Sequence, residues 1–285
     1  MRWFALLIAP VAASALASPV GAPVPFGGDT LARADDGFEV TLNATWTPDG
    51  DEILFSRAMK DWSRIQIRTA PVRDGAIGAA RAVPFADPGA RDVDPFVTPD
   101  GRSVVFASDR ALPGDGGARA YHLWKADRVG SGWGPARPLA GEAAALGALL
   151  YPSVDHDGML VFTRSMADGP RLYAATLRGD AIVDAAPIAI PGVTLALDAT
   201  VANDGRSIVF VAPVEPGSRA KAIYRTRREG AGWSTPQMLH RPAPPATNVL
   251  ATGLSLDGRT LYFTSNLPVP GSGNVSNVFG LTLPD

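Results

Sequence analysis

One short motif occurs five times in this chain of 285 residues and limits the folds that it can adopt. Each copy is an Asp-Gly pair followed by a β-favouring run that ends in Phe. The aspartates are Asp49, Asp100, Asp157, Asp204 and Asp257, at intervals of 51, 57, 47 and 53 residues. A repeat of roughly 40–50 residues is typical of the blades of a β-propeller. The sequence therefore predicts an all-β chain, a single β-propeller of four-stranded antiparallel blades.

Each Asp-Gly pair has a physical reason to form a tight turn. The Asp side chain bonds to nearby backbone, and Gly accepts the positive φ that other residues avoid. We therefore predict that these pairs close the hairpin between the two inner strands of each blade and have a structural role. The residues of these turns are Asp49, Gly50, Asp100, Gly101, Asp157, Gly158, Asp204, Gly205, Asp257 and Gly258.

The ends of the chain predict how the ring closes. A third strand is expected after each copy and a fourth, outer strand after that, most clearly at 132–139 and 232–239. The last copy has room for only three strands. The segment Pro23–Phe26 resembles the outer strand at 236–239, so we predict that it completes the last blade. Five blades then use the whole mature chain; six blades, the alternative, would need a degenerate blade for which no interval has room.

Composition excludes several classes of protein. The 30 Gly and 26 Pro exclude a helical bundle, while 46% hydrophobic residues suffice for a core. The absence of Cys excludes disulfides, thiolate zinc sites, thiol nucleophiles and a lipid-modified cysteine. The formal charge of −2 provides no basic field for nucleic acid. We expect a monomer with no cofactor, no metal and no nucleic-acid partner.

The N-terminus predicts export. Residues 1–17 have one positive charge at Arg2, an apolar stretch and then small residues, which is the pattern of a secretory signal peptide. Cleavage is expected after Ala17, with Ala15 as the alternative. The propeller domain would then span 18–285, with no membrane span in the mature chain, in the periplasm or outside the cell.

The repeats resemble a known family. The segment 94–101, with its Pro-Asp-Gly turn, continues through Phe106 to Ser108-Asp109-Arg110. It is similar to the WD40-like repeat of TolB-type propellers. The resemblance implies the propeller fold and fits exported protein-binding modules, gating domains of prolyl-oligopeptidase-like peptidases and unassigned envelope proteins. Only about 30 residues separate the predicted signal from the first turn, too few for the N-terminal domain of TolB, and no peptidase domain is expected, so TolB-specific partners are not inferred.

The same repeats place a candidate site. The innermost strands of a propeller converge at one mouth of the central channel, and five residues lie six positions before the turn aspartates: Asn43, Asp94, Tyr151, Asp198 and Ala251. Loops after the second strands return to that face. The predicted binding residues are Asn43, Asp94, Tyr151 and Asp198 from the strands, and Arg57, Asp109, Arg110, Arg164 and Asn266 from the loops.

Two functions from different classes fit these residues. Asp94 and Asp198 are weak catalytic candidates, because glycoside hydrolysis uses paired carboxylates; alternatively they bond the backbone of the next blade or pair with Arg57, Arg110 or Arg164, which we favour. No Gly-x-Ser-x-Gly nucleophile motif occurs. We therefore expect an exported, non-catalytic module that binds a protein or a small-molecule or glycan ligand at the mouth or at loops 107–121 and 264–276. A glycan-active enzyme is the alternative.

Overall fold

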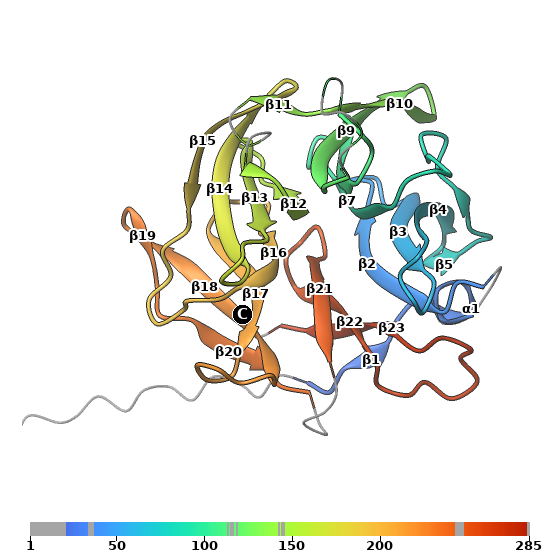
Figure 1. Ribbon diagram of the computed structural model, residues 1–285. Helices are drawn as coiled ribbons and strands as arrows, with labels where there is room; N and C mark the ends of the chain where they lie inside the picture. Colours follow the sequence, from blue (N-terminus) through green and yellow to red (C-terminus); the bar gives the residue numbers. More distant parts are fainter. Residues whose placement is uncertain are drawn as a thin grey trace, which may run out of the picture.

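The computed structural model confirms a five-bladed β-propeller, in which five small antiparallel sheets stand around one axis (Figure 1). It describes residues 21–33, 37–112, 114, 117, 119–141, 143, 146–242 and 248–283. The predicted signal peptide at 1–17 therefore lies outside the described residues. Among those that are described, no helix has the length and apolar character needed to cross a membrane.

The sheets follow one another along the chain, with the innermost strand of each blade first. Blade 1 contains β2 (Val40–Trp46), β3 (Glu52–Ala58), β4 (Ile65–Arg73) and two short outer strands on β4, β5 (Ala76–Ile77) and β6 (Arg81–Ala82). Blade 2 contains β7 (Asp92–Val97), β8 (Ser103–Ser108), β9 (His122–Val129) and β10 (Gly132–Pro138). Blade 3 contains β12 (Leu149–Val154), β13 (Met159–Arg164), β14 (Arg171–Arg178) and β15 (Ala181–Pro187).

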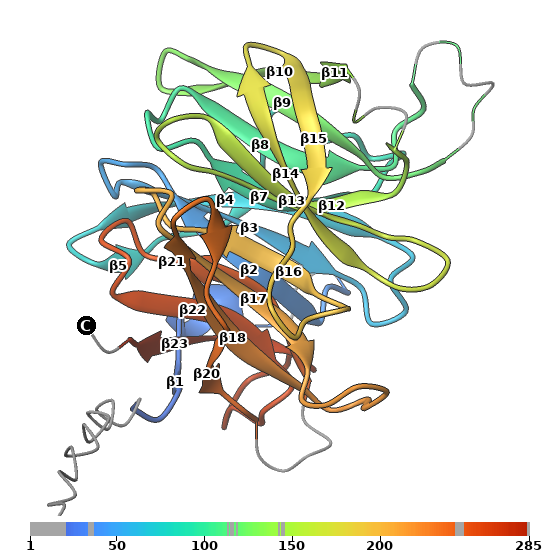
Figure 2. The same ribbon diagram turned by 90° about the vertical axis from the view of Figure 1, so that its left-hand side faces the viewer.

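The last two blades differ at their outer edges. Blade 4 contains β16 (Leu197–Val201), β17 (Ser207–Pro213) and β18 (Lys221–Glu229), and its outer strand is split into β19 (Gly232–Trp233) and β20 (Gln237–His240). Blade 5 contains β21 (Val249–Leu254), β22 (Thr260–Ser265), β23 (Asn277–Thr282) and the N-terminal β1 (Val24–Pro25). β1 pairs antiparallel with β23, Val24 opposite Gly280. The predicted closure by residues near Pro23–Phe26 is confirmed, and the side view also places β1 beside β23 (Figure 2).

The Phe that ends each motif accounts for much of the packing between blades. The side chains at these five equivalent positions are fully buried: Phe55, Phe106, Phe162, Phe210 and Phe263. Four of them stack on an aromatic side chain with nearly parallel rings, for example Phe162 on Tyr173 at 5.7 Å between centroids. Burying one such side chain contributes about 1.5–3 kcal/mol. One repeated residue thus supplies an anchor to every blade.

Two elements do not follow the repeat. A short helix α1 (Gly28–Ala32) carries Leu31 into the blade 1 core beside Ile53 and Phe55. The two-residue strand β11 (Ala140–Gly141) pairs parallel with the outer strand of blade 3. Both lie in the segments that connect blades, where the sequence pattern that identifies the repeat is absent.

A second closure joins blades 5 and 1 at the channel-mouth end. The β22–β23 loop forms a parallel bridge from Ser276 to Val40, and the Asn274 side chain donates to the Leu31 carbonyl at 2.7 Å. Arg57, only 1% exposed, donates to the carbonyls of Leu31, Arg33 and Phe38 and to Asn274 Oδ1. The ring is therefore fastened both at its rim and near its axis.

Candidate functional site

The five residues predicted to ring the channel mouth share one backbone conformation. In every blade the innermost strand has one extra residue relative to its neighbour, a β-bulge, at this position. The φ angles are 22° at Asn43, 56° at Asp94, 52° at Tyr151, 54° at Asp198 and 55° at Ala251. A non-glycine residue in this region costs on the order of 1–3 kcal/mol and persists only where the surrounding structure enforces it. The channel mouth is thus a ring of five bulges.

Four of these bulges are held by a hydrogen bond to the backbone N–H from the preceding blade. Ser56 Oγ accepts from Asp94 N at 3.1 Å, and Thr163 Oγ1 accepts from Asp198 N at 3.1 Å. In the next interface after each of these, the acceptor is a carboxylate. Asp94 Oδ2 accepts from Tyr151 N at 3.2 Å, and Asp198 Oδ2 accepts from Ala251 N at 2.9 Å.

The choice between hydroxyl and carboxylate follows a rule in the sequence. Blades 1, 3 and 5 have a hydroxyl directly after the motif Phe, at Ser56, Thr163 and Thr264, whereas blades 2 and 4 have Ala107 and Val211 there. Aspartate occupies the bulge only in those two blades. The carboxylate therefore replaces a missing hydroxyl, which matches the expectation that Asp94 and Asp198 bond the backbone of the next blade.

Only one oxygen of each carboxyl, Oδ2, accepts the N–H of a bulge. Asp94 and Asp198 are each 1% exposed, and the Oδ1 atom of Asp94 has no hydrogen-bond partner among the described residues. The Asp198 carboxyl also interacts with the Tyr151 side chain, and this hydrogen bond lowers the pKa of Asp198. Burial raises the pKa of Asp94 well above its usual value, and the charge of Asp198 raises it further, against the hydrogen bond from Tyr151 N. Burial also raises the pKa of Asp198, to about 6, although the Ala251 N–H and the charge of Lys221 oppose it. Both groups favour the protonated form more than an exposed Asp does.

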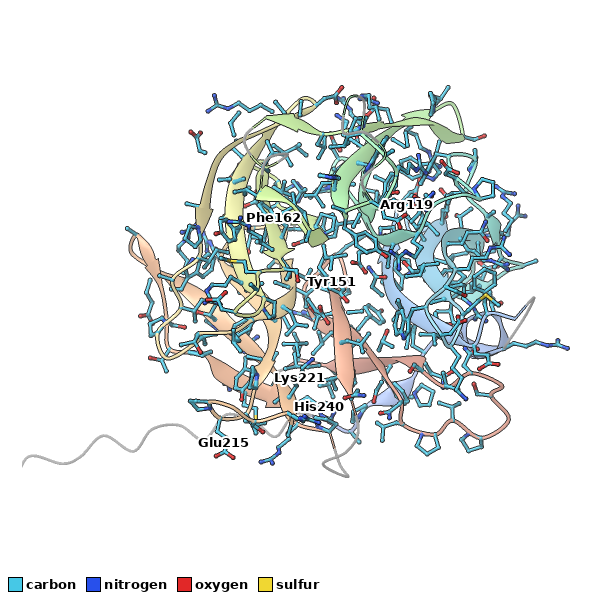
Figure 3. All side chains as sticks on the ribbon, viewed as in Figure 1. Arg119, Tyr151, Phe162, Glu215, Lys221 and His240 are labelled. Atoms are coloured by element: carbon cyan, nitrogen blue, oxygen red, sulfur yellow. The ribbon has the colours of Figure 1, made fainter. Side chains whose placement is uncertain are left out.

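Tyr151 and Lys221 complete the surroundings of these carboxyls. Figure 3 shows Tyr151 close to the centre of the ring and Lys221 farther from it. Loss of hydration raises the pKa of Tyr151 well above its usual value, and the charges of Asp198 and Asp94 add to the effect. Lys221 begins β18, and the effect of its charge on Asp198 could not be found from the motif because Lys221 lies outside the repeated segment.

The channel itself is narrow. A cavity of about 20 Å³ is lined by all five innermost strands, with Tyr151, Phe96 and Leu254 in its wall. A site for a single water needs about 10–15 Å³ on this scale. The cavity therefore has room for about one water and none for a sugar ring.

The loop residues predicted to reach the mouth are largely bound to other protein groups. Arg57 is enclosed at the closure between blades 5 and 1, as described above. Arg164 donates to the Leu146 carbonyl at 2.9 Å and to the Tyr173 hydroxyl at 3.1 Å. Asn266 is exposed, and its Oδ1 accepts from Asn248 N at 2.8 Å.

Asp109 and Arg110 form two separate ion pairs at the end of blade 2. Asp109, 1% exposed, accepts from Arg91 Nε at 2.9 Å. Arg110 reaches Asp92 instead, with 2.7 Å between its terminal nitrogen and Oδ2, and lies over the ring of Trp124. None of the three predicted arginine partners pairs with Asp94 or Asp198.

The Asp-Gly turns have the predicted geometry, with one exchange of roles. All five glycines have positive φ, and the Asp carboxylate accepts a backbone N–H two residues later in blades 1, 2, 4 and 5. In blade 3 that role falls to Asp155, whose Oδ1 accepts from the N–H groups of Asp157 and Met159 at 3.0 and 2.8 Å. Asp155 stands where blades 1 and 2 have Thr47 and Thr98, whose hydroxyls bond the turn Asp.

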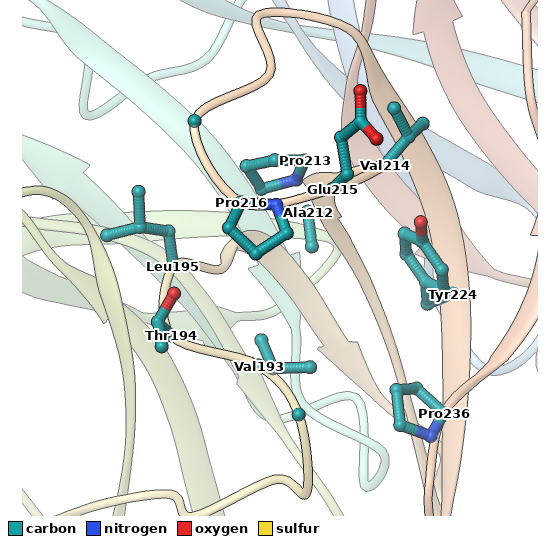
Figure 4. Close-up of a pocket in the computed structure, with 12 residues that line it drawn as sticks. Val193, Thr194, Leu195, Ala212, Pro213, Val214, Glu215, Pro216, Tyr224 and Pro236 are labelled. Carbon is teal, nitrogen blue, oxygen red and sulfur yellow. The ribbon is translucent and has the colours of Figure 1, made fainter.

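A second hollow, which the motif did not indicate, opens on the flank of blade 4. This pocket of about 200 Å³ lies between the loops at 192–195 and 213–217, as Figure 4 shows. Pro213, Pro216 and Pro236 give it rigid apolar walls, and the Tyr224 hydroxyl and the Glu215 carboxylate are at its upper edge in that view. Most of its residues come from the connecting segments 192–195 and 214–217, so repeat analysis could not have located it.

Comparison with known proteins shows the fold. No family model matches the chain, and no curated protein matches its sequence. TolB from Acinetobacter baumannii is similar at a TM-score of 0.54 and 14% identity, over 86% of this chain and 55% of that one. A TolB homologue from Agrobacterium tumefaciens, described as putative, gives 0.51 and 15%, over 86% and 83%.

An enzyme is equally similar in structure. The catalytic domain of an α-L-arabinofuranosidase from Coprinopsis cinerea gives a TM-score of 0.57 at 11% identity, over 93% of this chain and 96% of that one. At such low sequence identity, a structural similarity shows a shared fold and does not show a shared activity. The chain therefore shares the propeller fold both with proteins named TolB and with a glycoside hydrolase.

Proposed function

We propose that this protein is an exported, non-catalytic propeller that binds a protein or a small ligand at its channel-mouth face. The observation that carries the proposal is the structural use of Asp94 and Asp198. Each holds the bulge of the next blade with one oxygen, each is 1% exposed, and the cavity behind them is about 20 Å³. A paired-carboxylate hydrolase needs both carboxyls beside an open substrate site, roughly 5–9 Å apart.

The face around the channel mouth supports a binding role. The second-to-third strand loops of all five blades reach this face, and the charged and polar residues in or next to them include Arg119, Lys221 and Asn266. Functional residues of rigid scaffolds are concentrated in such loops. A location in the cell envelope or outside the cell follows from the signal-peptide pattern at 1–17 and belongs to the proposal.

One observation favours the alternative, a glycan-active enzyme. The Oδ1 atom of Asp94 is unpartnered within the described structure, and burial raises the pKa of both Asp94 and Asp198. Raised carboxyl pKa values are typical of catalytic acids. The two functions therefore need an experiment that separates them.

That experiment is a hydrolase screen with matched variants. Wild type, Asp94→Asn and Asp198→Asn are assayed against aryl glycosides and polysaccharides, with the exposed turn variant Asp204→Asn as control. We expect no turnover above the uncatalysed background in any of these proteins. Turnover in wild type that disappears in Asp94→Asn or Asp198→Asn, while the melting temperature stays at or above that of wild type, would establish the enzyme instead.

A further inference from the structure

The five loops that join the second and third strands differ at one backbone position. Four of them have a glycine with positive φ: Gly114 at 89°, Gly169 at 120°, Gly217 at 80° and Gly271 at 78°. In blade 1 the corresponding residue is Trp62, at 60°. Trp62 and Gly169 are a close match, because each donates its N–H to the carbonyl three residues back, at 2.9 and 3.1 Å.

Trp62 has an unfavourable backbone conformation and an unfavourable exposure to solvent when the protein has no partner bound. A bulky residue with positive φ is a conformational outlier that glycine would avoid. Its side chain is also 43% exposed, among the large hydrophobic residues at the surface. Among the described residues it makes no ring stacking or cation–π contact. Backbone strain combined with an exposed indole indicates a use outside the fold.

Hydrogen bonds hold the backbone of the loop that carries Trp62. Met59 N donates to the Arg64 carbonyl at 3.0 Å across the base of the loop. The Asp61 carboxylate accepts from the N–H and the hydroxyl of Ser63 at 3.0 and 2.6 Å, and these bonds lower its pKa. Asp61 is thus engaged within the loop. A loop whose backbone is ordered in this way loses little entropy on binding.

Two cationic residues flank Trp62 in the sequence. Lys60 and Arg64 are both exposed, and neither forms an ion pair with any residue that the structure describes. The Arg64 guanidinium lies over the Phe38 ring, 5.2 Å from its centroid, which orients it. Trp and Arg are enriched among the residues that dominate protein interfaces.

We propose that Lys60, Trp62 and Arg64, here named the Trp62 patch, dock an acidic segment of a partner protein whose surface has an apolar pocket for the indole. The patch specifies the partner chemistry for the binding role proposed above, and it rests on that role. A protein fits better than a bilayer, because membrane binding scales with buried apolar area and the patch has one large apolar side chain.

The test is selection of short peptides from a displayed random library on wild-type protein, followed by calorimetry of individual synthetic peptides. We expect peptides in which an aromatic or aliphatic residue is accompanied by Asp and Glu. Their affinity should fall by at least about tenfold in Trp62→Gly and in Lys60→Glu, and should weaken with salt. The control Val129→Ala removes a side chain that is 64% exposed at the opposite end of the ring, and it should bind as wild type does.

The folding of Trp62→Gly separates docking from a structural role. Because glycine suits positive φ, the variant should melt at the same temperature as wild type or higher. A clearly lower melting temperature would overturn the proposal by making Trp62 a structural residue. Selected peptides that are basic or neutral, or that bind Trp62→Gly equally well, would also overturn it. So would sedimentation of wild type, but not of Trp62→Gly, with vesicles of zwitterionic and anionic phospholipid when no acidic peptide binds.

Failure of this inference differs from failure of the proposed function. If selected peptides are insensitive to Trp62→Gly but lose affinity in Lys221→Ala, binding occurs at the channel mouth, and only the Trp62 patch is wrong. If a glycosidase dependent on Asp94 is found, the non-catalytic role is wrong whatever the peptides do.

Discussion

The interfaces between successive blades fall into two kinds that perform the same task with different chemistry. Between blades 1 and 2, and between blades 3 and 4, a neutral hydroxyl holds the N–H of the next bulge. Between blades 2 and 3, and between blades 4 and 5, a buried carboxyl does so. The hydroxyl interfaces gain a hydrogen bond without burying a charge. The carboxyl interfaces gain the same bond but bury an ionisable group whose pKa depends on folding, so they should respond to pH whereas the others should not.

The interface between blades 5 and 1 is a third case and should be the most sensitive to mutation. Arg57→Leu leaves the carbonyls of Arg33 and Phe38 without their donor, whereas the Leu31 carbonyl keeps the donors of Thr41 and Asn274. Each orphaned group costs about 1–3 kcal/mol, so we expect a loss of roughly 3–5 kcal/mol in the free energy of unfolding. Urea denaturation measures it. A loss below about 1 kcal/mol would mean that the rim strand alone closes the ring.

The pH dependence of a carboxyl interface comes next in size. The folded pKa of Asp198 is about 6, above the unfolded value, so its contribution is fully present below about pH 4 and is lost as pH rises through about 6. We expect Asp198→Asn to raise the free energy of unfolding at pH 8 by about 2–3 kcal/mol relative to wild type, and to change it little at pH 4. Denaturation at both pH values tests this. An equal effect at both would show that Asp198 does not titrate between them.

Removing the hydroxyl from a hydroxyl interface should lower the free energy of unfolding by the same amount at every pH. Thr163→Val conserves volume and leaves the buried Asp198 N–H without its acceptor, so we expect a loss of about 1–3 kcal/mol that is the same at pH 5 and pH 8. Thr264→Val is the matched control, because its hydroxyl donates to the Thr41 carbonyl and holds no bulge N–H. Similar losses in both variants would remove the special role of the bulge contact.

A hydroxyl should be able to replace a carboxyl as the acceptor of the bulge N–H with only a small loss of stability. Asp94→Ala leaves the Tyr151 N–H unpaired, and Ala107→Ser adds a hydroxyl at the place where blade 1 has Ser56. We expect Ala107→Ser to recover about 1 kcal/mol of what Asp94→Ala loses at pH 4, where the carboxyl is protonated. A double-mutant cycle measures the recovery. Strictly additive effects would contradict the exchange of acceptors.

Repetition determines what the sequence could reveal. The Asp-Gly turns and the buried Phe were predictable because each occurs five times with one physical role. The closing strand was predictable because a blade with three strands lacks an edge. Helix α1 and the burial of Leu31 occur once and depend on tertiary contacts with blade 1. The charge of Lys221 affects the pKa of Asp198 only once the ring has folded.

The spacing of the motif could predict which residues lie in the ring of bulges but not what their side chains do there. The channel-mouth positions follow from spacing, and all five proved equivalent in the backbone. The reason for Asp94 and Asp198 required two positions to be compared together, the bulge and the residue after the motif Phe. That signal was present in Ala107 and Val211. The Asp155 exchange in blade 3 was hidden because a second Asp sits in the expected place.

The two closures of the ring, the β1–β23 pairing and the contacts of the β22–β23 loop with blade 1, also bear on the order in which it folds. The contact between Asn274 and Leu31 joins residues 243 positions apart. Such long-range contacts carry a large loop-closure cost and slow folding. During synthesis, blades 1 to 4 can form as neighbouring sheets, but blade 5 needs both ends of the chain. Until blade 5 is available, the face of blade 1 that packs against it has no partner, so we expect the step that converts the open arc into a ring to be the last to occur.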